Sequence, residues 1–196
     1  TPSSAASDVY KRQGSELVVS NESAAIAVSQ VFLNTNMAAA GGVVAAIITS
    51  LVLTGKMDVT MAMNGAIAGL VSITASPSAP SAGIALLIGA AGGALVYFSI
   101  LYFDKRLKLD DPVGAISAHG IVGILGVMVV PFTSDASFIW QAIGVISISG
   151  FSFFASLGTI LLINNFMPIR ASDEEQDVGL GLDLSEIGVE AYPDFK

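Results

Sequence analysis

The chain contains one histidine, His119, and this is the side chain whose type and setting best fit a chemical role. It lies among glycine, alanine and branched aliphatic residues, and the nearest charged residue is Asp111, eight positions earlier. An ionisable residue inside a long apolar segment is a functional candidate, and loss of water favours neutral imidazole over imidazolium. A neutral imidazole donates a hydrogen bond with one ring nitrogen and accepts one with the other.

Other kinds of chemistry find little support in the composition. The chain has no cysteine and a single histidine, which excludes disulfides, thiolate metal sites and imidazole clusters. The sequence also lacks a phosphate-binding loop and a pair of carboxylates in an apolar setting on which acid–base catalysis could run. We therefore expect a protein that is not an enzyme and that holds no metal or cofactor. We also expect no nucleic-acid partner.

The composition is that of a membrane protein. Of the 196 residues, 53% are hydrophobic and 12% charged, against about 25% charged in an average soluble domain. A helix needs about 20 apolar residues to cross a bilayer. Five stretches qualify, the second being the shortest and weakest, so we expect an all-α membrane protein with a bundle of about five transmembrane helices. They are residues 24–53, 61–76, 82–103, 113–132 and 138–162.

The basic residues predict the orientation of this bundle. If the five helices alternate in direction, the loops at 55–60 and 104–112 share one side with the tail, and these three segments carry Lys56, Lys105, Arg106, Lys108 and Arg170. The loops near residues 80 and 135 contain no lysine or arginine. The positive-inside rule then places the N-terminus outside and the C-terminus in the cytoplasm, although Lys11 and Arg12 contradict this pattern.

The residues around His119 predict open space beside its ring. From Val113 the histidine is about 9 Å along a helix, in the inner half of the hydrocarbon layer. Its neighbours on the same helical face are Ala115, Gly123 and Gly126, which carry almost no side-chain volume. A void beside a polar ring predicts a path for a small solute.

Two structural explanations remain open. The histidine can instead form a hydrogen bond between helices, with an amide or hydroxyl such as that of Asn34, Asn36, Asn64 or Ser117. The glycines at 65 and 69, at 89, 92 and 93, and at 120, 123 and 126 are equally typical of tightly packed membrane helices. A structural bundle without transport would explain both features.

Several longer segments point to a particular family. They are GSEL at 14–17, NTNMAAAGG at 34–42, MNGAIAGLVSITA at 63–75, FDKRLKLDDPVGAISAHGIVGILG at 103–126 and GLDLSEIGVEAYP at 181–193. Together they resemble the ammonium transporter family, the ammonium and methylammonium permeases related to the Rhesus proteins. The resemblance covers roughly residues 14–193.

The resemblance implies an eleven-span homotrimer in the plasma (inner) membrane, with one narrow hydrophobic pore for ammonium or ammonia in each subunit. The five spans here would be the last five. His119 matches the second of two stacked pore histidines, and Ser15 matches a serine that helps to recruit ammonium at the outer vestibule. Asp111 matches the acidic residue at the base of the histidine-bearing helix. We expect Asn64, Gly120 and Gly123 to support the pore.

The resemblance also divides the chain. Residues 1–13 match no part of the family pattern and are expected to be a leader or junction, residues 14–166 the membrane region, and residues 167–196 a cytoplasmic acidic tail. We expect the chain to be a fragment that does not conduct ammonium by itself, because transporters of this type place the substrate path between two inverted halves.

Composition alone makes the tail a solvated acidic segment. The resemblance adds coupling between subunits and a docking place for a PII-type signal protein, with Gly181, Leu182 and Asp183 as candidate regulatory residues. An ammonium sensor is the alternative function.

Overall fold

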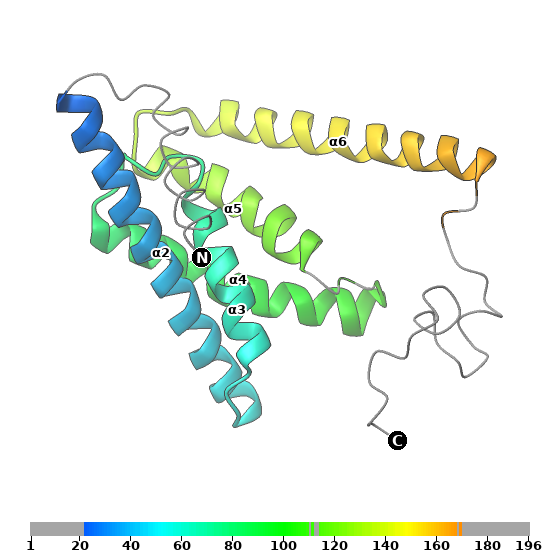
Figure 1. The fold of residues 1–196 in the computed structure, drawn as a ribbon, viewed down its shortest axis with the longest axis horizontal. Helices are drawn as coiled ribbons and strands as arrows, with labels where there is room; N and C mark the ends of the chain where they lie inside the picture. The colour runs from blue at the N-terminus through cyan, green and yellow to red at the C-terminus, as the bar shows by residue number, and fades with distance from the viewer. Residues whose placement is uncertain (1–21, 110, 112–113, 168, 170–196) are drawn as a thin grey trace, which may run out of the picture. The chain divides into compact units, whose positions relative to one another are not determined.

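The computed structural model describes residues 22–109, 111, 114–167 and 169 (Figure 1). All regular structure in these residues is helical, which confirms the expected all-α class. The elements are α2 (Glu22–Thr54), α3 (Val59–Ile73), α4 (Ala82–Tyr102), the π-helices η1 (Phe103–Leu107) and η2 (Ala115–Ile121), α5 (Val122–Val129), the 3₁₀-helix η3 (Val130–Phe132) and α6 (Phe138–Phe166).

Four helical segments are long and apolar enough to cross a membrane: Glu22–Thr54, Ala82–Leu107, Ala115–Phe132 and Phe138–Phe166. They correspond to four of the five predicted spans. The remaining one, α3, has 15 residues and spans about 22 Å at 1.5 Å per residue, which is less than a hydrocarbon core of about 30 Å. The sequence marked this segment as the weakest for the same reason.

The chain divides into two compact units, Thr1–Val145 and Ile146–Lys196, and the boundary falls within α6. The first unit contains α2, α3, α4, η1, η2, α5 and η3. Helix α6 is a continuous apolar helix of 29 residues. All the residues discussed below as a site belong to the first unit.

Helices α2, α3 and α4 touch through their backbones. A Cβ atom built on Gly42 of α2 would lie 2.1 Å from the carbonyl oxygen of Gly65 in α3, and one built on Gly93 of α4 would lie 2.1 Å from the carbonyl oxygen of Gly42. Helices in lipid gain van der Waals contact when small residues allow this approach. The glycines of α3 and α4 therefore pack helices together, as their spacing predicted.

A small apolar cluster packs the histidine-bearing segment against α3 and α4. Ala118 of η2 and Val122 of α5 are fully buried and pack with Ala68 of α3 and Val96 of α4. Because Ala118 immediately precedes His119, this cluster fixes the backbone from which the imidazole projects.

We expect Gly89→Ala to destabilise the unit. The new Cβ would lie 2.0 Å from the backbone carbonyl oxygen of Ala38, which cannot move without shifting α2. Overpacking of this kind costs about 1–3 kcal/mol. Thermal unfolding in mild detergent, followed by circular dichroism, measures the change.

Gly83→Ala is the matched control, because it lies in the same helix and a Cβ there meets no atom within 4 Å. Equal unfolding midpoints for the two variants would contradict the contact between α2 and α4.

Candidate functional site

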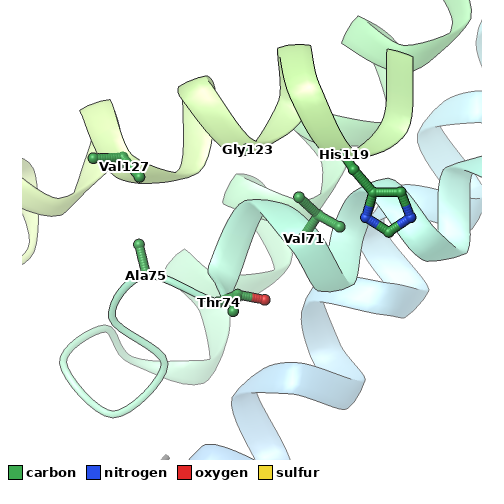
Figure 2. Close-up of a pocket in the computed structure, with 6 residues that line it drawn as sticks. All are labelled: Val71, Thr74, Ala75, His119, Gly123 and Val127. Atoms are coloured by element: carbon green, nitrogen blue, oxygen red, sulfur yellow. The ribbon is translucent and has the colours of Figure 1, made fainter. Parts of the chain in front are cut away.

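A pocket of ≈ 470 Å³ lies beside His119. One wall comes from the end of α3 and the residues after it, namely Val71, Thr74 and Ala75. The other comes from η2 and α5 and consists of His119, Gly123 and Val127, at intervals of four residues (Figure 2). His119, Thr74 and Ala75 are exposed, so the pocket is open in this part of the chain.

The pocket is chemically simple. Its lining is aliphatic apart from the imidazole and the Thr74 hydroxyl. That hydroxyl donates to the carbonyl oxygen of Leu70 at 2.7 Å, which leaves its oxygen free to accept a hydrogen bond. The arrangement suits a small solute that carries N–H groups and tolerates apolar walls.

Sequence reasoning identified one wall of this pocket and missed the other. His119 and Gly123 were singled out, whereas Val71, Thr74, Ala75 and Val127 were not. Periodicity within one helix shows which residues share a face, but it does not show which helix covers that face. The sequence did contain one signal for the second wall, because the MNGAIAGLVSITA segment that resembles the family ends at Ala75.

The histidine-bearing segment begins differently from the expectation. A regular helix from Val113 was predicted, but the helical segment begins at Ala115 and its first seven residues form the π-helix η2. At its end, the N–H of Val122 bonds to the carbonyl oxygen of Ser117, five positions back. In such a turn Gly114, rather than Ala115, lies one turn before His119.

Gly114 explains where this segment starts. Its φ is +64°, a left-handed conformation that L side chains rarely adopt. A Cβ there would also lie 2.9 Å from Oδ1 of Asn64. Asn64 itself is half-buried and donates from Nδ2 to the carbonyl oxygen of Thr60 at 3.2 Å, so it packs α3 against the start of η2.

Asp111 accepts hydrogen bonds from the first backbone N–H groups of η2. Its Oδ1 accepts from Ile116 at 3.1 Å and its Oδ2 from Ser117 at 2.9 Å. Burial acts to raise the pKa of Asp111, but the backbone N–H groups of Ser117 and Ile116 outweigh it and hold the pKa below its ordinary value of 3.8. The ionised carboxylate therefore anchors the helix that presents His119.

The other glycines of this segment have different surroundings. A Cβ on Gly120 would meet no atom within 4 Å, and one on Gly123 would lie 3.8 Å from Val71 Cγ1 across the pocket. Gly126 packs on α3, where a Cβ would lie 2.8 Å from the carbonyl oxygen of Ser72. Gly123 thus lines the pocket, whereas Gly126, expected on the same face, is buried at the helix contact.

The three amides considered as structural partners of His119 bond elsewhere. Asn34 donates to the carbonyl oxygens of Pro77 and Pro80, Asn36 to that of Phe32, and Asn64 to that of Thr60. The hydroxyl of Ser117 is buried, and among the described residues it does not bond to His119. Within the described part of the chain, the imidazole of His119 forms no hydrogen bond with any of them.

Four of the predicted site residues, Ser15, Gly181, Leu182 and Asp183, lie outside the described residues. Among the residues that are described, no three His, Asp or Glu side chains gather in a group that could hold a metal ion.

The sequence profile of the Ammonium Transporter Family matches residues 13–192. The chain belongs to this family. It is 33% identical over 179 residues to "Ammonium transporter" of Bacillus subtilis (strain 168), covering 83% of this chain and 44% of the relative. It is 34% identical over 189 residues to "Ammonium transporter Amt2" of Archaeoglobus fulgidus, covering 86% of this chain and 40% of the relative.

Two solved structures share the fold of this chain. The structure named "Sensor Amt Protein" superposes with a TM-score of 0.79 at 32% identity, covering 89% of this chain and 44% of that one. Candida albicans Mep2 superposes with a TM-score of 0.70 at 22% identity, over 76% of this chain and 38% of that one, which shows the fold alone. The chain thus spans less than half the length of the ammonium transporters and the structures that it matches. These relatives and the apolar helices identify it as a membrane protein.

We expect Asp111→Asn to lower stability at neutral pH, because the amide offers one acceptor oxygen where the carboxylate offers two. The pKa of Asp111 is depressed in the folded state, so its contribution is present above the unfolded pKa and is lost as pH falls through the folded pKa. The unfolding midpoints of the two proteins should therefore differ at pH 7 and converge as the pH falls below the folded pKa of Asp111, which lies under 3.8.

Asp104→Asn serves as the control, since the exposed Asp104 carboxylate accepts no hydrogen bond from the described residues. A difference between Asp111→Asn and the parent that persists unchanged at low pH would rule out the anchoring role of the carboxylate.

Proposed function

We propose that this chain forms part of a pathway that transports ammonium or ammonia across the membrane, and that the pathway runs through the pocket beside His119. The pocket itself carries the proposal, because its open, apolar wall lies beside an imidazole that forms no hydrogen bond with the described residues. The names of the relatives support the choice of solute.

The chemistry of the pocket fits ammonia better than an intact cation. Stripping water from ammonium in an apolar passage is very costly, so the cation must lose its proton or have it carried separately. Neutral ammonia can donate to one imidazole nitrogen of His119 or accept from the other. The aliphatic wall formed by Val71 and Val127 offers nothing that replaces the hydration shell of an alkali ion, which is thereby rejected.

We further propose that the open side of the pocket is closed by the part of the transporter that the matches do not cover. In transporters with inverted repeats, the path lies between the two halves. Transport is therefore tested in a complemented transporter. In it, this chain is co-expressed with the portion of the Bacillus subtilis relative that lies outside the match between the two.

His119→Ala is expected to lower the uptake of labelled methylammonium by about tenfold or more in this system, since one buried hydrogen bond to the solute is worth roughly 1.5 kcal/mol. His119→Gln keeps a donor and an acceptor but cannot carry a proton. It should restore part of the solute flux while lowering the proton-coupled current measured on a supported membrane.

Thr49→Ala is the control, because among the described residues its half-buried hydroxyl bonds within α2 alone, to the carbonyl oxygen of Ala45. Parent-like uptake by His119→Ala, at equal amounts of protein in the membrane, would remove the pocket from the pathway.

The orientation and assembly belong to the same proposal. We propose that the protein lies in an inner membrane as a homotrimer with its C-terminus in the cytoplasm, an orientation that the basic residues of the loops support. The acidic tail, with Gly181, Leu182 and Asp183, is proposed to couple subunits and to offer a docking place for a PII-type signal protein.

Removal of residues 171–196 from the complemented transporter should reduce uptake without reducing the amount of protein in the membrane, because coupling between subunits is lost. Uptake assays matched to quantitative immunoblots measure this effect. Unchanged uptake would exclude the coupling role of the tail.

A sensor is the second candidate, and the likeness to the structure named "Sensor Amt Protein" favours it. A sensor would bind ammonium without passing it. Saturable ammonium binding with uptake no higher than that of empty cells would support the sensor and exclude the transporter.

A further inference from the structure

Asn34 of α2 holds the connection between α3 and α4 by two hydrogen bonds. Its side chain is fully buried, and Nδ2 donates to the carbonyl oxygen of Pro77 at 2.9 Å and to that of Pro80 at 2.7 Å. These carbonyls lie 43 and 46 positions later in the chain. A buried carbonyl without a donor is costly, so one amide group supplies what the connection needs at two points.

The geometry fixes which way the amide faces. Two carbonyl oxygens can be satisfied only by the NH₂ group, so Oδ1 must point away from them. In the described part of the chain, that oxygen is buried and has no hydrogen-bond partner. Among the described residues, Asn34 therefore acts as a hydrogen-bond donor, and its two bonds fix the carbonyl groups of Pro77 and Pro80.

The segment that Asn34 holds leads directly from the pocket wall. Ala75 lines the pocket and lies two residues before Pro77, a distance of at most about 7 Å along the backbone. On the other side, Ile73 is buried in a cluster with Ala38, one turn along α2 from Asn34. Thr74 and Ala75 are therefore tied to α2 at both ends.

We propose that Asn34 is a positioning residue that sets the width of the pocket at Thr74 and Ala75, and thereby the size of the solute that passes. The role in solute selection rests on the proposed transport function. The positioning itself does not, and it can be measured without transport.

The absence of cysteine from the chain gives a direct probe of this wall. Ala75→Cys places a single thiol in the exposed wall of the pocket, and its rate of reaction with a small methanethiosulfonate reagent reports how the wall is held. Adding Asn34→Asp keeps the size and shape of the side chain but removes both N–H donors and leaves at most one O–H, which cannot serve both proline carbonyls. The labelling rate in membranes should then change by about tenfold, as expected when buried hydrogen bonds are lost.

Asn36→Ala is the matched control. Asn36 lies in the same helix and is exposed. Within the part of the chain that the structure describes, it donates to the carbonyl oxygen of Phe32 in its own helix alone. It should leave the labelling rate of Cys at position 75 unchanged. In the complemented transporter, Asn34→Asp without the thiol should change the ratio of methylammonium to ammonium uptake, and Asn36→Ala should not.

Each outcome decides a separate point. An unchanged labelling rate in Asn34→Asp overturns the positioning role, and a changed rate with an unchanged uptake ratio overturns the role in solute selection. If Asn34→Asp changes the labelling rate but the complemented transporter carries no ammonium even without substitutions, the positioning role stands while the proposed function fails. If Asn34→Asp does not accumulate in the membrane, Asn34→Ser, which keeps one donor, takes its place. The same two measurements, the labelling rate and the uptake ratio, then decide.

Discussion

Direct contact between the backbones of α2, α3 and α4 is the constraint on which the first unit depends. The carbonyl oxygen of Ala38 in α2 occupies the space where a Cβ of Gly69 in α3 or of Gly89 in α4 would lie, at 2.2 and 2.0 Å. Helices in a membrane gain little from hydrophobic burial against one another, so close approach is their main source of attraction. This one crossing point fixes the end of α3 and therefore one wall of the pocket.

The histidine-bearing segment is attached to this framework by polar contacts at its start and by apolar contacts further along. Asp111 and the left-handed Gly114 determine where η2 begins, and Ala118 and Val122 hold the segment against α3 and α4. The regular helix begins only after His119, at Val122. The departure from α-helical geometry thus coincides with the residue that is the best candidate for chemistry, as is common for π-helical turns.

Much of the fold followed from the sequence because membrane spans are long and uncharged. The first predicted segment, 24–53, corresponds to Glu22–Thr54, and the last, 138–162, to Phe138–Phe166. The position of the fourth segment was predicted correctly, but its π-helical start was not. The positive φ of Gly114 and the two hydrogen bonds accepted by the Asp111 carboxylate have no effect on hydropathy. His119 stood out by its type, whereas Thr74 and Ala75 depend on a contact between helices that periodicity does not encode. The hydrogen bonds of Asn34 to two prolines were equally invisible, because they join positions far apart in the chain.

The π-helical form of η2 also constrains the length of this segment among relatives. A π turn closes over five residues where an α turn closes over four, so η2 holds one residue more than a regular helix between the same anchors. Loss of a single residue between Asp111 and His119 would let the segment relax to α-helical winding between the same anchors and leave the imidazole in place. Without that relaxation, the imidazole would turn by about 100° around the helix axis relative to Asp111. In family members that use this histidine in the same way, a one-residue gap in this interval is therefore expected only where the segment begins as a regular α-helix.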